Sequence, residues 1–269
     1  MFSDPNSAFW FYGRLHPVSK VPPFQAEEIE VEDKVRLEVV WDGIGVWSRP
    51  GTKRFKQPGE AAELFGLVVA AYALLTGEAL DFSSDGWVEA KNAHFDGTIL
   101  GFQARQMKSS DQVNKNSEES IALQSACSLA VVLRRESGYR LGLRDIYSSL
   151  REVGNDAFFY AYRAIETVAR YALDCTDLEA AQWKKFHSEM GIDPGEGRAR
   201  LKPLKAARDA LAHGDEGATA IGEAARQRRQ LLDVARWFVI TAFEKSPALN
   251  LPDLTPYKPW SSLPRLQPQ

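Results

Sequence analysis

The sequence predicts an α+β module at the N-terminus and an all-helical bundle of four to six helices after it. Up to residue 116 of the 269-residue chain, glycines, aromatic residues and runs of alternating polarity dominate. From residue 117 to 246 the apolar residues recur at helical spacing. The last stretch, 247–269, holds six prolines in 23 residues, which excludes a helix and favours an extended tail. The chain is therefore divided into 1–116, 117–246 and 247–269.

The N-terminal module is predicted from strand-like runs. Residues 29–41 alternate apolar side chains at odd positions with charged ones at even positions, which indicates one buried and one solvated face of a strand. Shorter strands are predicted at 9–12, 46–47, 86–90 and 98–105. Residues 60–76 have helical length and are followed by Gly77, a residue that favours a helix C-terminus.

The bundle is predicted from six helical runs, over residues 121–136, 143–153, 156–173, 177–190, 203–213 and 219–245. Glycines follow several of these runs, and Pro203 stands where the first turn of a helix tolerates proline. The helical stripes place seven large side chains in the core: Phe158, Tyr162, Ile165, Leu204, Leu211, Trp237 and Phe238.

Composition limits the classes of function. The net charge of −3 provides no overall positive field, so any nucleic-acid site has to be a local patch. The two cysteines, Cys127 and Cys175, are far apart and have no histidines beside them, so neither a zinc site nor a disulfide framework is expected. They are interpreted as small buried residues in a reducing compartment. No metal and no cofactor are expected.

The sequence indicates neither a targeting signal nor a membrane span. The N-terminus lacks a basic start followed by an apolar core. The longest uncharged apolar stretch, residues 64–77, is shorter than the roughly 20 residues that a spanning helix needs. A cytoplasmic protein without membrane contact is the expectation.

The run from Arg208 to His213 is the strongest candidate for chemistry. On a helical wheel Leu204, Ala207 and Leu211 form the buried stripe, and Arg208 flanks it. Asp209 and His213 share the exposed side at i, i+4, a spacing that lets the carboxylate hydrogen-bond one ring nitrogen and fix its tautomer. A histidine for proton transfer and an arginine for phosphate charge suffice for a phosphodiesterase without metal.

These residues resemble the Arg-polar-x3-His motif of the HEPN superfamily (higher eukaryotes and prokaryotes nucleotide-binding). The glycine after His213 and an upstream helix with an acidic residue, Glu166, also resemble that superfamily. The resemblance covers the C-terminal half. Gly77 and residues 81–90 more faintly resemble MauJ-type methylamine-utilisation proteins.

The HEPN resemblance implies a metal-independent endoribonuclease. Arg208, Asp209 and His213 would be its catalytic residues, and two copies of the motif would face one cleft in a homodimer. A toxin or phage-defence setting, with an antitoxin or regulatory protein as partner, follows from the habits of the superfamily. The alternative is a catalytically inactive interaction or nucleotide-binding module whose N-terminal domain senses a ligand.

The sequence also supports predictions for further charged and titratable residues. Arg198, Arg200, Lys202 and Lys205 form a lopsided basic stretch that is predicted to bind RNA. Glu166 either supports the Arg208–His213 pair or pairs with Arg163 or Arg170 on its own helix, and the second interpretation is favoured. His187, on an amphipathic run, is expected at the surface.

Overall fold

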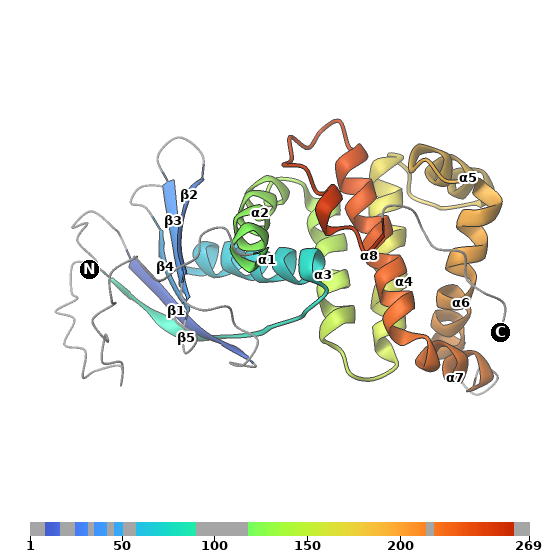
Figure 1. The fold of residues 1–269 in the computed structure, drawn as a ribbon, viewed down its shortest axis with the longest axis horizontal. Coiled ribbons are helices and arrows are strands. Elements are labelled where there is room, and N and C mark those ends of the chain that lie inside the picture. The colour runs from blue at the N-terminus through green and yellow to red at the C-terminus, as the bar shows by residue number, and fades with distance from the viewer. Residues whose placement is uncertain are drawn as a thin grey trace. The chain divides into compact units, whose positions relative to one another are not determined.

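The computed structural model describes residues 9–16, 25–31, 35–41, 46–50, 58–89, 118–213 and 218–260 (Figure 1). The chain divides into two units, one made of residues 1–66 and 80–124 and the other of residues 67–79 and 125–269. The predicted strand at 98–105 lies outside the described residues. No helix in the described ranges is long and apolar enough to cross a membrane.

The first unit contains a five-stranded antiparallel sheet. Its strands are β1 (Phe9–His16), β2 (Gln25–Val31), β3 (Val35–Trp41), β4 (Val46–Pro50) and β5 (Asp81–Glu89), in the spatial order β2-β3-β4-β1-β5. The run at 29–41 falls on two strands rather than one. Because β2 and β3 pair with Ile29 opposite Leu37 and Val31 opposite Val35, the alternation of polarity continues across the pair.

The second unit confirms the prediction of a helical bundle. The helices are α1 (Pro58–Thr76), α2 (Glu118–Leu133), α3 (Ser137–Arg151), α4 (Asp156–Ala172), α5 (Ala180–Glu189), α6 (Pro194–His213), α7 (Ala218–Arg226) and α8 (Arg228–Lys245). Within it α4 packs against α3, α6 and α8 (Figure 1). The two ends of α1 and of α2 fall in different units.

Helix α6 begins well before the predicted start at Pro203. Asp193 caps its N-terminus, because Oδ1 accepts hydrogen bonds from the backbone N–H groups of Gly195 (2.9 Å) and Glu196 (3.0 Å). Pro194 takes the first helical position, where proline loses no helical hydrogen bond. Pro203 therefore lies inside the helix and is tolerated there at the loss of one hydrogen bond.

The predicted helix 219–245 is broken at Gln227 into α7 and α8. The guanidinium of Arg228, the first residue of α8, donates a hydrogen bond to the carbonyl oxygen of Gly154 (2.8 Å) and another to that of Glu152. This arginine ties the start of α8 to the α3–α4 connection. The start of α8 is therefore held by a partner that is distant in the sequence.

Six of the seven predicted core residues are buried, with exposed fractions of 0–6%. The seventh, Leu211, is only half-buried, although Leu204 and Ala207 on the same stripe are fully buried. Leu211 lies in the last turn of α6, where the helix end leaves the stripe less covered. In the part of the chain that the structure describes, neither cysteine is in a disulfide; Cys127 is buried as expected, whereas Cys175 is half-buried.

Arg236 on α8 satisfies the C-terminal end of α1. Its side chain is buried, and it donates from Nε to the Leu74 carbonyl oxygen and from Nη2 to that of Leu75, both at 2.8 Å. Nη1 donates to Asp233 at 2.8 Å, which supplies the countercharge. A helix end leaves its last carbonyl groups without partners, so Arg236 acts as the cap of α1.

Gly77 ends α1 in a conformation that alanine resists. Its φ is +78°, and an added Cβ would lie 2.6 Å from Nη1 of Arg236. Gly77→Ala is therefore expected to lower the free energy of unfolding by at least about 1–2 kcal/mol. Gly66→Ala is the matched control, because a Cβ at Gly66 meets nothing within 4 Å and should stabilise α1 by about 0.5–1 kcal/mol. Urea unfolding of both variants checks this, and equal stabilities would contradict it.

The first part of the proline-rich tail packs against the bundle. Leu254 is fully buried, and the Tyr257 hydroxyl lies 2.9 Å from the hydroxyl of Ser125. The indole N–H of Trp237 donates to the carbonyl oxygen of Trp260 at 3.2 Å. Residues 247–260 therefore follow the bundle as irregular chain with one short 3-10 turn, Thr255–Tyr257.

Candidate functional site

The centre of the candidate site is an ion pair between α4 and α6. Arg208 Nη2 donates to Glu166 Oε1 at 2.9 Å, and the two side chains are 24% and 22% exposed. The interpretation that Glu166 pairs on its own helix is wrong, because Arg163 instead forms a bidentate pair with the buried Asp145 of α3. Glu166 thus supports Arg208 from a neighbouring helix.

Tyr162 lies under the Arg208 guanidinium. The guanidinium carbon is 4.7 Å from the centroid of the tyrosine ring, which favours a cation–π contact. Tyr162 and Glu166 stand at i, i+4 on α4, so both meet the same residue of α6. Burial and the charge of Glu166 raise the pKa of Tyr162 to about 12, although Arg208 opposes this rise. The phenol therefore stays neutral. Arg208 is held by the carboxylate of Glu166 and by the face of the Tyr162 ring.

Asp209 contacts the cations of Lys205 and Arg208 rather than the ring of His213. Its Oδ2 accepts a hydrogen bond from Lys205, and its Oδ1 lies 3.2 Å from Nη1 of Arg208. Among the described residues these are the polar partners of the carboxylate, so the expected hydrogen bond to the histidine ring is not formed. Asp209 positions Lys205 and Arg208.

His213 is the last residue of α6, and its side chain is exposed. The exposed orientation agrees with the helical wheel, which placed the ring opposite the buried Leu204. Arg208 lies five residues earlier, so the two side chains belong to the same end of the helix. The structure thus brings Glu166 and Asp209 into contact with Arg208, whereas His213 lies more than one turn farther along α6 and about 140° around the helix from Arg208.

The basic stretch divides between surface and core. Arg198, Lys202 and Lys205 are exposed and recur at i, i+4 and i+7, which is one face of α6. Arg200 is buried, with 3% exposed, and its Nη2 donates to Glu196 at 2.8 Å. The prediction that Arg200 binds RNA is wrong, because a step of two residues rotates it about 200° away from Arg198.

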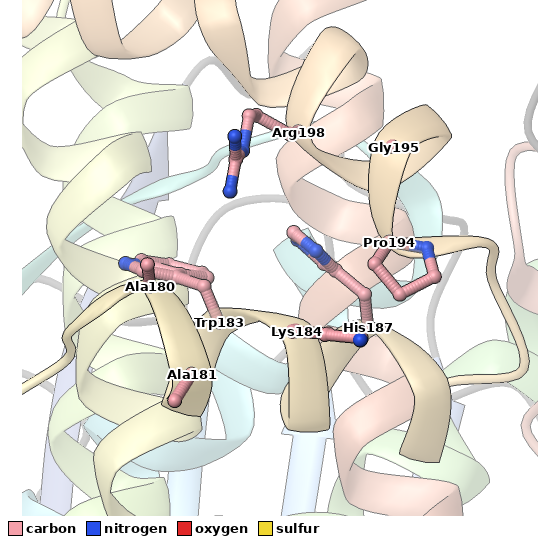
Figure 2. Close-up of a pocket in the computed structure, with 8 residues that line it drawn as sticks. All are labelled: Ala180, Ala181, Trp183, Lys184, His187, Pro194, Gly195 and Arg198. Atoms are coloured by element: carbon pink, nitrogen blue, oxygen red, sulfur yellow. The ribbon is translucent and has the colours of Figure 1, made fainter.

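Sequence reasoning missed a pocket between α5 and the start of α6 (Figure 2). It has a volume of about 440 Å³ and is lined by Ala180, Ala181, Trp183, Lys184, His187, Pro194, Gly195 and Arg198. His187 was expected at the surface but is 97% buried, since only 3% of it is exposed. The available signals were the i, i+4 spacing of Trp183 and His187 and the small residue Gly197, whose added Cβ would lie 2.6 Å from the imidazole.

The surroundings of His187 keep its ring neutral. Burial, reinforced by the positive charge of Arg198, lowers the pKa of His187, although a hydrogen bond to the backbone of Pro194 acts in the opposite direction. Nε2 is buried and has no hydrogen-bond partner. The ring also lies 5.7 Å from Trp183 and 5.9 Å from Phe238, measured between centroids.

This lowered pKa predicts a pH-dependent stability. The unfolded chain binds a proton at His187 near the ordinary pKa of 6.5, whereas the folded chain binds it only at lower pH. The free energy of unfolding should therefore fall as the pH drops below about 6.5. His187→Phe is expected to flatten this slope, as measured by urea unfolding between about pH 4.5 and 7. Identical slopes for the two proteins would contradict it.

Within the described ranges, histidine, cysteine, aspartate and glutamate side chains nowhere gather in a group of three that could hold a metal ion. The polar chemistry of α4, α5 and α6 therefore consists of cations, carboxylates that pair with them, and two histidines. One histidine is exposed at the end of α6, and the other is buried in the wall of a pocket.

Comparison with known proteins places the candidate site in a shared region. Residues 123–242 match the model of a family described as the C-terminal domain of DUF8168, a domain of unknown function. No curated protein and no solved structure matches the chain. The matched residues include Glu166, Arg208 and His213 together with both walls of the pocket, so these features lie in the part of the chain that is similar to that family.

Proposed function

We propose that the bundle is a metal-independent endoribonuclease of the HEPN type that acts through Arg208 and His213. The observation that carries the proposal is the arrangement at the end of α6. An exposed imidazole follows an arginine that is fixed by Glu166 and by the Tyr162 ring. A fixed guanidinium loses little freedom when it meets a phosphate, and an exposed imidazole is free to exchange protons with substrate.

The reaction is a transesterification within RNA. His213 removes the proton of a ribose 2′-hydroxyl, the 2′-oxygen attacks the adjacent phosphorus, and the bond from phosphorus to the 5′-oxygen breaks. The imidazolium of a second His213, from another copy of the chain, donates a proton to that leaving oxygen. Arg208 stabilises the charge on the phosphoryl oxygens. The products are a 2′,3′-cyclic phosphate and a 5′-hydroxyl.

In this mechanism the donors of Arg208 would have separate tasks. Nη2 remains on Glu166, and Nη1 faces Asp209, which is 34% exposed. A phosphate that enters the site takes Nη1 from Asp209, whose carboxylate stays neutralised by Lys205. Exposed Arg198, Lys202 and Lys205 supply the phosphate contacts along α6.

The test is cleavage of end-labelled single-stranded RNA by the full chain in excess EDTA, with analysis of the product ends. Cleavage that leaves a 2′,3′-cyclic phosphate supports the proposal. Cleavage that requires Mg²⁺, or that leaves a 3′-hydroxyl, refutes the mechanism. Incubation with a mixture of RNA sequences shows whether cleavage occurs at preferred positions.

We expect a homodimer through the helical half. One histidine per chain provides either the base or the acid, so two symmetry-related motifs are needed for both proton transfers. Light scattering at micromolar concentration should give a mass twice that of the chain. A monomer across that range would count heavily against the mechanism.

The alternative function is an inactive, nucleotide-binding or interaction module, with the N-terminal α+β module as a sensor. The observation that favours it is that Arg208 already contacts two carboxylates, Glu166 and Asp209. RNA binding without cleavage in the EDTA assay would select this alternative. A cytoplasmic toxin or phage-defence role, with an antitoxin as partner, belongs to the ribonuclease proposal alone.

A further inference from the structure

The pocket between α5 and α6 has a consistently positive wall. Lys184 from α5 and Arg198 from α6 are its charged side chains, and none of its lining residues is acidic. Among the described residues neither cation has an ion-pair partner. The nearby acids are engaged elsewhere, because Asp193 caps α6 and Glu196 pairs with Arg200. The pocket therefore favours an anionic ligand.

The same pocket has an aromatic wall. Trp183 is half-buried, and its ring lies 6.1 Å from Tyr162 and 5.7 Å from His187, measured between centroids. These neighbours fix the indole in place. Figure 2 shows the Arg198 side chain extending from α6 toward Trp183 of α5. In this view the His187 ring lies between Trp183 and Pro194. A planar ligand is able to stack on a fixed indole at small entropic cost.

We propose that this pocket binds a nucleotide unit, with its base stacked on Trp183 and its phosphate paired with Arg198 and Lys184. A cavity of about 440 Å³ falls within the size range of small-molecule sites. Arginine provides two parallel hydrogen bonds to a phosphate, and lysine adds a point charge.

The nucleotide unit has two possible sources, a free nucleotide or a residue of an RNA strand. Lys202 and Lys205 continue the exposed face of α6 from Arg198 toward His213. The fifteen residue steps from Arg198 to His213 span about 22 Å of helix. A strand that follows this face would place one base in the pocket and another part of its backbone near His213. Binding of an RNA strand rests on the proposed function, whereas binding of a free nucleotide does not.

The experiment is isothermal titration calorimetry of the full-length protein with AMP, adenosine and ribose 5-phosphate. We expect AMP to bind more tightly than either half. Arg198→Gln and Trp183→Leu should each weaken AMP binding by about tenfold. Lys185→Gln is the matched control for Lys184→Gln, because Lys185 is exposed outside the pocket and pairs with Glu189. Thermal melting verifies folding of each variant, and Arg198→Gln carries the test if Trp183→Leu unfolds.

A second titration distinguishes the two sources. A short oligoadenylate is titrated into the His213→Ala variant, which keeps the strand intact under the proposed mechanism. Tighter binding than AMP, with a steeper salt dependence that Lys202→Gln reduces, identifies an RNA strand. Equal binding of AMP and oligomer identifies a free nucleotide. The absence of saturable binding at millimolar AMP, or equal affinities in the Arg198, Trp183 and Lys185 variants, overturns the proposal whatever the RNA cleavage assay gives.

Discussion

His213→Ala should lower the rate of RNA cleavage by about 10²–10⁴-fold and leave the free energy of unfolding unchanged. The loss follows because the side chain that exchanges protons with the 2′-hydroxyl and the leaving oxygen is gone. Stability is preserved because the ring is exposed at the last residue of α6. Initial rates on labelled RNA, with urea unfolding of the same protein samples, measure both quantities.

Lys245→Ala provides the matched control, because Lys245 is also an exposed, basic residue in the last turn of a helix. It should cleave RNA at the rate of the unchanged protein. Cleavage that persists at full rate in His213→Ala would remove the histidine from the mechanism. In mixtures of active and His213→Ala chains, a dimeric site predicts that mixed dimers lose activity as well, since each cleavage needs two histidines.

Arg208→Ala should reduce cleavage by about 10²–10³-fold, and Arg208→Lys should recover only part of that loss. Alanine removes the charge that stabilises the transition state, whereas lysine restores a charge without the planar pair of donors. Alanine also leaves Glu166 without its partner and uncovers the Tyr162 ring. A smaller free energy of unfolding is therefore expected for Arg208→Ala than for Arg208→Lys, as measured by urea unfolding.

Glu166→Gln separates the positioning of Arg208 from its charge. Glutamine still accepts a hydrogen bond from Nη2, so the guanidinium keeps its place while one countercharge is removed. Arg208 should then bind RNA phosphate at least as well as before, and the Michaelis constant should fall or stay constant. A loss as large as that of Arg208→Ala would instead identify Glu166 as part of the chemistry.

The helical periodicity predicted burial well but not the choice of polar partners. It identified Phe158, Tyr162 and Ile165 as core residues because a stripe repeats regardless of what covers it. Asp209 has Lys205 and His213 at equal spacing on either side, so spacing alone does not select between them. Side chains on a helix lean toward its N-terminus, which carries the carboxylate toward Lys205 and away from His213.

Other features depend on residues that are distant in the sequence. The burial of His187 follows from the packing of α6 over α5, with Gly197 against the ring, and the i, i+4 spacing of Trp183 and His187 on α5 does not by itself say which element covers the ring. Similarly, Arg228 ties the start of α8 to the carbonyl groups of Glu152 and Gly154. Such contacts are set by tertiary packing, which local propensity does not encode.

The cap that Arg236 places on α1 determines how the helical half can be produced alone. A fragment that begins at residue 117, or at residue 123 where the family match starts, lacks Leu74 and Leu75. It leaves the Arg236 guanidinium with Asp233 as its remaining partner in the described chain, and a buried cation that loses its acceptors is strongly destabilising. Such a fragment should be rescued by fragment complementation with a separate peptide of residues 58–79, since that peptide returns both carbonyl groups to the arginine.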